Sequence, residues 1–173
     1  MTNTDISIHI LEIAQNALAA GASLVHVEVV ETADSVSFTV TDDGVGMTKD
    51  EAVNALLVGY STKNSSGFGI PNCKSAAESA DGEFSIESGI GHGTCVRASF
   101  MKRAEVTLGD IAETFAALMC AERDADIVFT HTADGREVCA VDTRQWRTLL
   151  GSVPLSTPVV VSFAKDYIRE RET

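Results

Sequence analysis

Two neighbouring segments with alternating apolar and polar residues constrain the fold more than any other feature of the sequence. Residues 24–31 carry valine at every second position, and residues 35–41 alternate Val36, Phe38 and Val40 with serine and threonine. This period of two is typical of strands that bury one face, and the Thr-Ala-Asp between the segments favours a hairpin. A sheet with one apolar face needs a second layer to cover it.

Helical periodicity on both sides of the hairpin supplies that layer. Apolar residues at helical spacing predict a helix over about 6–20. Thr48 and Glu51 form a capping-box pattern that opens a short helix to about residue 57. A further helix over 70–79 and strands over 83–88 and 94–101 follow. Residues 1–102 are therefore expected to form an α+β two-layer sandwich, with helices on one face of a mixed β-sheet.

Residues 103–173 are expected to form a small C-terminal α/β subdomain packed on the first part. No flexible linker separates the two parts, and we expect the second to provide partner specificity. The segment after Pro158 has helical spacing, although its run of valines also permits a strand. The other predicted elements are a helix that begins near Thr107 or Asp110, a hairpin over 126–132 and 136–142, and a helix over 143–150.

The acidity of the chain limits what it can bind. It has 25 acidic and 13 basic residues, a formal net charge of −12. This balance argues against general binding of nucleic acid or of anionic membranes. A site for a polyanion in such a protein must rely on backbone amides and a metal ion.

The expected cellular compartment follows from signals that the sequence lacks. No stretch approaches the roughly 20 apolar residues that span a bilayer, and the polar N-terminus lacks the pattern of an export signal. The four cysteines are too widely spaced for a C-x-x-C motif. We therefore expect free thiols and a cytoplasmic protein.

Glu12 and Asn16 are the first residues that suggest chemistry. They lie four residues apart in the first predicted helix and so share one of its faces. A carboxylate beside an amide suits a base next to a metal ligand. Taken alone, an exposed polar stripe explains the pair equally well.

Three glycine-containing segments follow this pair. Residues 40–47, V-T-D-D-G-V-G-M, end a strand on an aspartate and let a ligand approach the backbone closely. Residues 65–71, S-S-G-F-G-I-P, run into a helix, whose N-terminal amides can bind phosphate without a lysine. Residues 91–94, G-H-G-T, can close one wall of a pocket. Each segment alone is also explained by a tight turn.

Together, in this order and spacing, the four segments resemble the gyrase, Hsp90, histidine kinase and MutL (GHKL) superfamily, whose ATP site is the Bergerat fold. L-E-I-A-Q-N-A-L-A-A-G-A is similar to the MutL-type E-x-x-x-N box. Residues 59–63, G-Y-S-T-K, resemble the stretch that precedes the lid glycines in sensor kinases. The resemblance covers roughly residues 5–101 and implies ATP and Mg²⁺ as cofactors.

The resemblance also implies a role for each matching residue. Glu12 would orient or deprotonate the attacking water or hydroxyl, which makes it the candidate catalytic residue. Asn16 would coordinate Mg²⁺, Asp42 would accept a hydrogen bond from the adenine amino group, and residues 48–66 would form a mobile lid. The implied nucleotide-binding positions are Asn16, Asp42, Gly44, Gly46, Met47, Lys63, Gly67, Phe68, Gly69, Ile70 and Thr94, with Gly93 beside them.

The sequence departs from the superfamily pattern at Ala19. Sensor kinases usually carry a basic residue there and MutL-type proteins an acid, so part of the metal or phosphate shell is missing or is supplied by Lys63. The sequence shows neither a MutL-type transducer domain nor a phosphoacceptor histidine helix. His9 is a candidate hydrogen-bond partner of Glu12, and Cys73 a candidate reactive thiol, with a structural role as the alternative for each.

These residues leave three functions open. The first is a regulatory protein that binds Mg²⁺-ATP and transfers the γ-phosphate to a serine or threonine of a protein partner, similar to anti-sigma factors. The second is a slow ATPase or an ATP-gated switch, in which nucleotide would remodel the surface that binds a partner or a second copy in a homodimer. The third is a nucleotide-sensing scaffold without chemistry, against which the presence of Glu12 argues.

Overall fold

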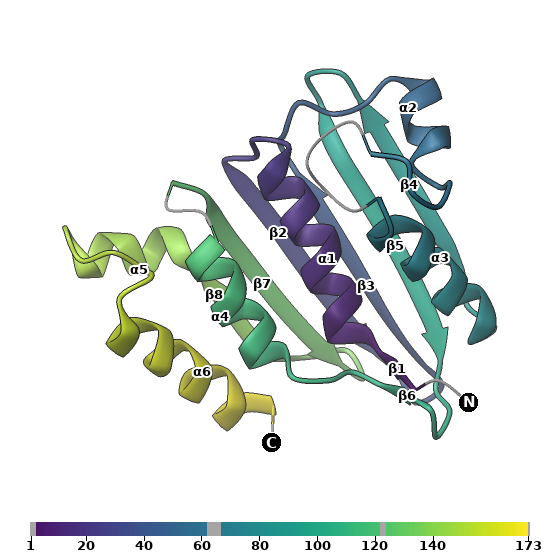
Figure 1. Ribbon diagram of the computed structural model, residues 1–173. Helices are drawn as coiled ribbons and strands as arrows, with labels where there is room; N and C mark the ends of the chain where they lie inside the picture. The colour runs from purple at the N-terminus through teal and green to yellow at the C-terminus, as the bar shows by residue number, and fades with distance from the viewer. Residues whose placement is uncertain (1–2, 62–66, 122–123, 173) are drawn as a thin grey trace.

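The computed structural model describes residues 3–61, 67–121 and 124–172 (Figure 1). Its main sheet has six strands in the order β4-β5-β3-β2-β7-β8. The β2–β7 pair is parallel and the other neighbours are antiparallel, which confirms the predicted mixed sheet. The strands are β2 (Leu24–Glu31), β3 (Ser35–Asp42), β4 (Phe84–Gly89), β5 (Gly93–Met101), β7 (Asp126–Ala133) and β8 (Arg136–Asp142).

Helices pack against one face of this sheet, as the sequence predicts. Figure 1 shows α1, α3 and α4 side by side in front of the strands. The helices are α1 (Ile6–Ala19), α2 (Lys49–Asn54), α3 (Gly69–Ser79), α4 (Ile111–Ala121), α5 (Thr143–Leu150) and α6 (Pro158–Glu172). The structure thereby confirms the α+β two-layer sandwich. Among the described residues, no helix combines the length and apolar content that crossing a bilayer requires.

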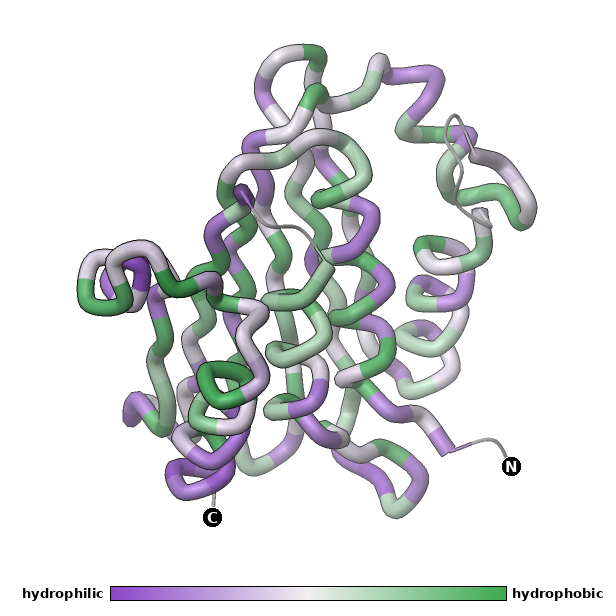
Figure 2. The backbone as a smooth tube through the Cα atoms, turned by 60° about the vertical axis from the view of Figure 1, so that its left-hand side comes forward, coloured by the Kyte–Doolittle hydropathy of each residue, from purple (hydrophilic) through white to green (hydrophobic). Residues whose placement is uncertain are grey.

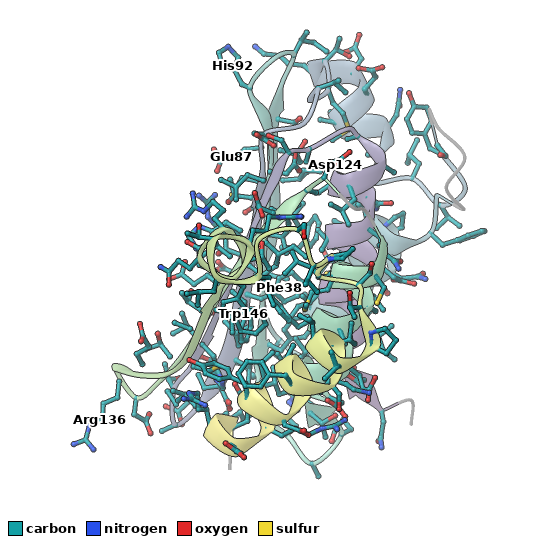
Figure 3. The ribbon with its side chains drawn as sticks, turned by 90° about the vertical axis from the view of Figure 1, so that its left-hand side faces the viewer. Phe38, Glu87, His92, Asp124, Arg136 and Trp146 are labelled. Carbon is teal, nitrogen blue, oxygen red and sulfur yellow. The ribbon has the colours of Figure 1, made fainter. Side chains whose placement is uncertain are left out.

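The core lies between the two layers. In Figure 2 the tube changes repeatedly between hydrophobic and hydrophilic colours along the strands, and Figure 3 places Phe38 between the sheet and the helices. The alternating residues that predicted the hairpin are each at most 3% exposed; they are Val25, Val27, Val29, Val36, Phe38 and Val40. The opposite face carries exposed polar side chains, including His26, Glu28, Thr41 and Arg97.

Helix α1 is fixed at both ends and along its buried face. Asp5 caps its N-terminus by accepting a hydrogen bond from the amide of Ser7 at 3.0 Å. The positive φ of Gly21, 75°, lets the chain turn directly into β2. The buried face comprises Ile6, Ser7, Ile10, Ile13, Ala14, Ala17 and Leu18. This burial fixes the rotation of the helix and therefore the direction of its polar face.

The sheet and the core continue across the expected boundary near residue 102. Strand β7 pairs with β2 along its whole length, from Leu24 opposite Asp126 to Glu31 opposite Ala133. One buried cluster includes residues of α1, α4, β7, β8 and α6. Residues on both sides of the boundary thus belong to one sheet. A separate, partner-specific subdomain over 103–173 stays a prediction.

Some element boundaries differ from the sequence prediction. Helix α2 ends at Asn54 rather than near Leu57; Ala55 directly after it is buried, whereas Leu57 is 58% exposed. Of the two alternatives for the last segment, the helix forms, since Val160, Ala164 and Ile168 bury one face at a spacing of four. An unpredicted parallel pair joins β1 (Thr4–Asp5) to β6 (Val106–Thr107). Two-residue strands leave no alternation to detect.

A buried histidine joins the last turn of α6 to the sheet. His131 of β7 is 3% exposed, and its Nδ1 lies 2.8 Å from both carboxylate oxygens of Glu172. Its Nε2 lies 3.0 Å from Oε1 of Glu31, an ion-pair contact without the alignment of a hydrogen bond. Lys102 also pairs with Glu31, at 3.1 Å. Four groups from separate segments thus meet where α6 ends.

An aromatic cluster packs against the middle of α6. Trp146 of α5 packs edge-on against Phe115 and Tyr167, with ring centroids 6.2 and 5.9 Å apart. Phe163 adds a third contact to the same indole at 5.7 Å. Figure 3 shows Trp146 directed toward α6 and the core. These contacts explain why α5 and α6 pack together although α6 buries few residues.

Candidate functional site

A cavity of about 460 Å³ lies between α1, the ends of β3 and β5, and the start of α3. This volume is in the range of small-molecule sites. Nine of the sequence-predicted binding residues line it: Glu12, Asn16, Asp42, Gly46, Met47, Gly67, Gly69, Ile70 and Thr94. Segments far apart in the sequence therefore converge on one space.

The remaining predicted residues lie beside the cavity or outside the described residues. Gly44 supports the cavity wall, because its amide donates a 2.8 Å hydrogen bond to Oδ1 of Asp42. Phe68 is 46% exposed and does not line the space. Gly93 also lies behind the lining. Lys63 falls in the stretch 62–66, outside the described residues, so its proposed contact with phosphate stays a prediction.

Asp42 sits at the apolar end of the cavity. It ends β3, is 9% exposed, and faces Thr94 across the β3–β5 pair. Burial raises the pKa of this carboxyl, against hydrogen bonds from the backbone of Gly44 and Thr94. Once ionised, this buried carboxylate is a strong hydrogen-bond acceptor for an amino group of a ligand.

Two glycines allow the turns behind Asp42 to pass close to each other. Gly46 has a φ of 69°, and a methyl group there would overlap the carbonyl oxygen of Gly89. Gly93 has a φ of 73°, and a methyl group there would overlap the carbonyl oxygen of Asp42. Both positions need the left-handed conformation and the missing side chain. The glycines of these motifs thus serve the close approach of two chain segments.

Glu12 and Asn16 meet the start of α3 at the polar end of the cavity. An ideal Cβ on Gly69 would lie 3.3 Å from Cβ of Glu12, 3.6 Å from its Oε2 and 3.6 Å from Nδ2 of Asn16. The carboxylate and the amide therefore lie beside the backbone of the first helical residue of α3. A larger residue at position 69 would narrow this space.

The N-terminus of α3 is open toward a ligand. Its N-cap residue, Phe68, makes no side-chain hydrogen bond to the helix, and Pro71 in the first turn has no amide hydrogen. Among the described lining residues, none is lysine, arginine or histidine. A negatively charged ligand at this end would rely on the helix dipole, on backbone amides and on a metal ion.

Sequence reasoning missed most of the apolar lining. The missed residues are Ile13, Gln15, Ala17, Ala20, Val40, Val45, Ala55, Tyr60, Ser61, Pro71 and Val96. Ile13, Val40 and Val96 look like ordinary core residues in the sequence, because they belong to the same periodic patterns. Tyr60 and Ser61 lie in the G-Y-S-T-K stretch, whose resemblance to a lid segment was the available signal. Ala19, where the superfamily pattern is broken, also lines the cavity.

Two further candidates prove to be structural. Cys73 of α3 is fully buried, and burial together with the charge of Glu12 raises the pKa of its thiol to about 12. Of the two alternatives for Cys73, the core-filling role is confirmed and the reactive thiol is wrong, because burial outweighs the helix N-terminus. Burial lowers the pKa of His9, and its ring stacks on Phe100 at 6.3 Å. Its Nδ1 has no hydrogen-bond partner among the residues that the structure describes.

Comparison with known proteins identifies the family of the chain. The model of the family "histidine kinase-, DNA gyrase B-, and HSP90-like ATPase" matches residues 3–104. A comparison with curated proteins returns no match.

Two solved structures match the chain at low sequence identity, and the one with the higher TM-score is similar to it in fold. The Aquifex aeolicus MutL ATPase domain complexed with ADP has a TM-score of 0.52 at 15% identity. That match covers 82% of this chain and 64% of the MutL chain, so the protein spans less than two thirds of it. The mycobacterial sensor histidine kinase MprB has a TM-score of 0.46 at 18% identity, with 55% of this chain and 68% of the kinase chain covered.

Proposed function

Because the chain belongs to the histidine kinase-, DNA gyrase B- and HSP90-like ATPase family, we propose that it binds Mg²⁺-ATP and transfers the γ-phosphate to a serine or threonine of a protein partner. The observation that carries the proposal is the meeting of Glu12 and Asn16 with the start of α3. It puts a carboxylate and an amide beside the backbone of Gly69, at a helix N-terminus that suits phosphate.

The two ends of the cavity suit the two ends of a nucleotide. Asp42, which would accept a hydrogen bond from the adenine amino group, lines the cavity together with the apolar residues Ile13, Val40 and Val96. At the other end, Gly67 and Gly69 would offer amides to the phosphates. The cavity thus separates a buried, apolar base site from an open, polar phosphate site.

The donor set fits Mg²⁺ that binds together with phosphate. Among the described residues, no group of three or more His, Cys, Asp or Glu side chains could hold a metal alone. Mg²⁺ commonly keeps several waters and takes one or two protein oxygens plus phosphate oxygens. The side-chain oxygen of Asn16 would be such a ligand, and the ion would neutralise phosphate charge in a cavity whose described lining residues include no lysine, arginine or histidine.

Glu12 would act as the general base for transfer. Its carboxylate would take the proton of the partner's hydroxyl, whose oxygen attacks the γ-phosphorus. The bond from this phosphorus to the β–γ bridging oxygen breaks, and ADP leaves. The products are a phosphorylated partner and ADP.

A second function, an ATP-gated switch with slow hydrolysis, is favoured by the packing of α2. This helix has no buried residue; its own Val53 is 64% exposed, and Val58, which follows it, is 70% exposed. A segment with so few core contacts can move at little cost when nucleotide binds. It could then present its apolar residues to a partner or to a second copy of the chain.

The four cysteines are free, so we also propose a reducing, cytoplasmic setting.

The test uses γ-labelled ATP and Mg²⁺ with the wild type, Glu12→Gln and a matched control, Glu28→Gln, on the exposed face of the sheet. Label on a lysate protein that depends on Glu12 supports transfer. Free phosphate without lysate supports the switch with slow hydrolysis, and ATP binding with neither product supports a nucleotide-sensing scaffold without chemistry. If Asn16→Ala and Asp42→Ala leave ATP affinity unchanged, the assignment of the cavity is wrong.

A further inference from the structure

Ser88 of β4 joins three groups behind the base end of the cavity. Its Oγ accepts a hydrogen bond from the amide of Met47 at 2.9 Å and donates one to the carbonyl oxygen of Gly93 at 2.9 Å. The same Oγ lies 2.8 Å from Oγ1 of Thr94. Ser88 does not line the cavity, whereas Met47 and Thr94 do. Any effect of Ser88 on a ligand must therefore pass through these neighbours.

The number of protons fixes the direction of the third hydrogen bond. A serine hydroxyl has one hydrogen to donate and two lone pairs to accept with. The carbonyl oxygen of Gly93 can only accept, so it takes the proton of Ser88. The amide of Met47 can only donate, so it takes one lone pair. One lone pair remains for Thr94, and the hydroxyl of Thr94 must therefore donate to Ser88.

Thr94 then has no proton left for a ligand. Its hydroxyl presents only lone pairs to the cavity, next to Asp42, whose ionised carboxylate also only accepts. Asp42 and Thr94 are direct neighbours across the β3–β5 pair. The polar part of the base site is thus a surface of acceptors, which suits a ligand edge that donates.

We propose that Ser88 is a positioning residue that sets base specificity: by holding the Thr94 hydroxyl as an acceptor, it favours a purine with a 6-amino group over one with a 6-oxo group. The inference rests on the proposed nucleotide site and adds the residue that orients its wall. A 6-amino group donates to both acceptors, whereas a 6-oxo oxygen meets lone pairs at the same place and leaves them unpaired.

The experiment compares three nucleotides that differ at position 6. Affinities for ATP, inosine triphosphate and purine riboside triphosphate are measured by calorimetry for the wild type, Ser88→Ala and the matched control Ser88→Thr. Removing the Ser88 hydroxyl frees the proton of Thr94, which can then donate to an oxo group. We expect the ATP-to-inosine preference to fall by about fivefold to tenfold in Ser88→Ala, the effect of one hydrogen bond. Ser88→Thr should keep the wild-type preference.

A double-mutant cycle separates this role from a merely structural one. If Ser88 acts through Thr94, Ser88→Ala has no further effect on the preference in a Thr94→Val background. Purine riboside triphosphate lacks a polar group at position 6 and reports general damage to the site. Equal weakening of all three nucleotides, or an unchanged preference, would overturn the proposal. If the wild type binds none of the three, the proposed function itself fails.

Discussion

Replacing His131 with glutamine should destabilise the protein in a way that depends on pH. The ring of His131 is buried between Glu172 of α6 and Glu31 of β2. Burial opposes its protonation, but the hydrogen bond and charge of Glu172 and the charge of Glu31 outweigh burial and raise the pKa of His131. Lys102, which pairs with Glu31, and Cys139, opposite His131 in the sheet, complete its surroundings. A glutamine keeps part of the volume and loses the charge.

The expected loss of stability follows from how exposed Glu31 and Glu172, the partners of His131, are. Removing one member of a buried ion pair costs about 3–5 kcal/mol, because a charge is left unpaired. Glu31 and Glu172 keep 24% and 19% of their side chains exposed, so water screens part of this cost. We therefore expect a loss of about 2 kcal/mol for His131→Gln. For a chain of this length, that corresponds to a melting temperature lower by about 4–8 °C.

The sign of the pH dependence is fixed by the raised pKa. The contribution of His131 to stability is complete below its usual pKa of about 6.5 and is lost as the pH rises through its higher value in the folded protein. Thermal unfolding from about pH 6 to about pH 9 measures this. The difference in melting temperature between the wild type and His131→Gln, here called the gap, should shrink as the pH rises. The control, His92→Gln at an exposed turn, should show no gap. A gap that is constant or grows with pH refutes the reasoning.

Four further outcomes test the site and the core. Asp42→Asn should weaken ATP binding by about tenfold or more in calorimetry, since a charged acceptor is lost. Because the pKa of Asp42 is raised, the ATP affinity of the wild type should also fall at a higher pH on acidification than it would with an ordinary aspartate. Gly46→Ala should abolish nucleotide binding and lower the melting temperature, and normal binding would contradict the close approach to β4. In mass spectrometry after thiol labelling, exposed Cys120 should react while Cys73 stays unmodified until the protein unfolds. Phe38→Ala should cost about 3–5 kcal/mol in denaturant unfolding, and a smaller loss would mean that the core closes around the gap.

The sequence predicts local elements well, because their periodicity is local. Alternating residues such as Val27 and Phe38 mark strands, and the capping box of Thr48 and Glu51 marks the start of α2. The parallel pairing of β2 with β7 could not be predicted, since it joins distant segments and leaves no repeat in either strand. The division of the chain near residue 102 came from a change of pattern, which carries no information on pairing.

The residues of the candidate site also fall into two groups: those that could be predicted from the sequence and those that could not. Residues whose chemistry is unusual for their position, such as Glu12, Asn16 and Asp42, were visible in the sequence. Apolar residues that line the cavity were not, because Val40 follows the same alternation as residues that only fill the core. The role of Ser88 was also hidden, since it depends on hydrogen bonds that three separate segments make.

The pairing of β2 with β7 has a consequence for how the protein is made. Leu24 leaves the ribosome long before its partner Asp126, so the edge of β2 stays open while the intervening segments are synthesised. An open, apolar strand edge can pair with other chains. Contacts between such distant residues also slow folding, because the chain must close a long loop first. Chaperone dependence during synthesis, and slow refolding of the purified chain, are the expected signs of this topology.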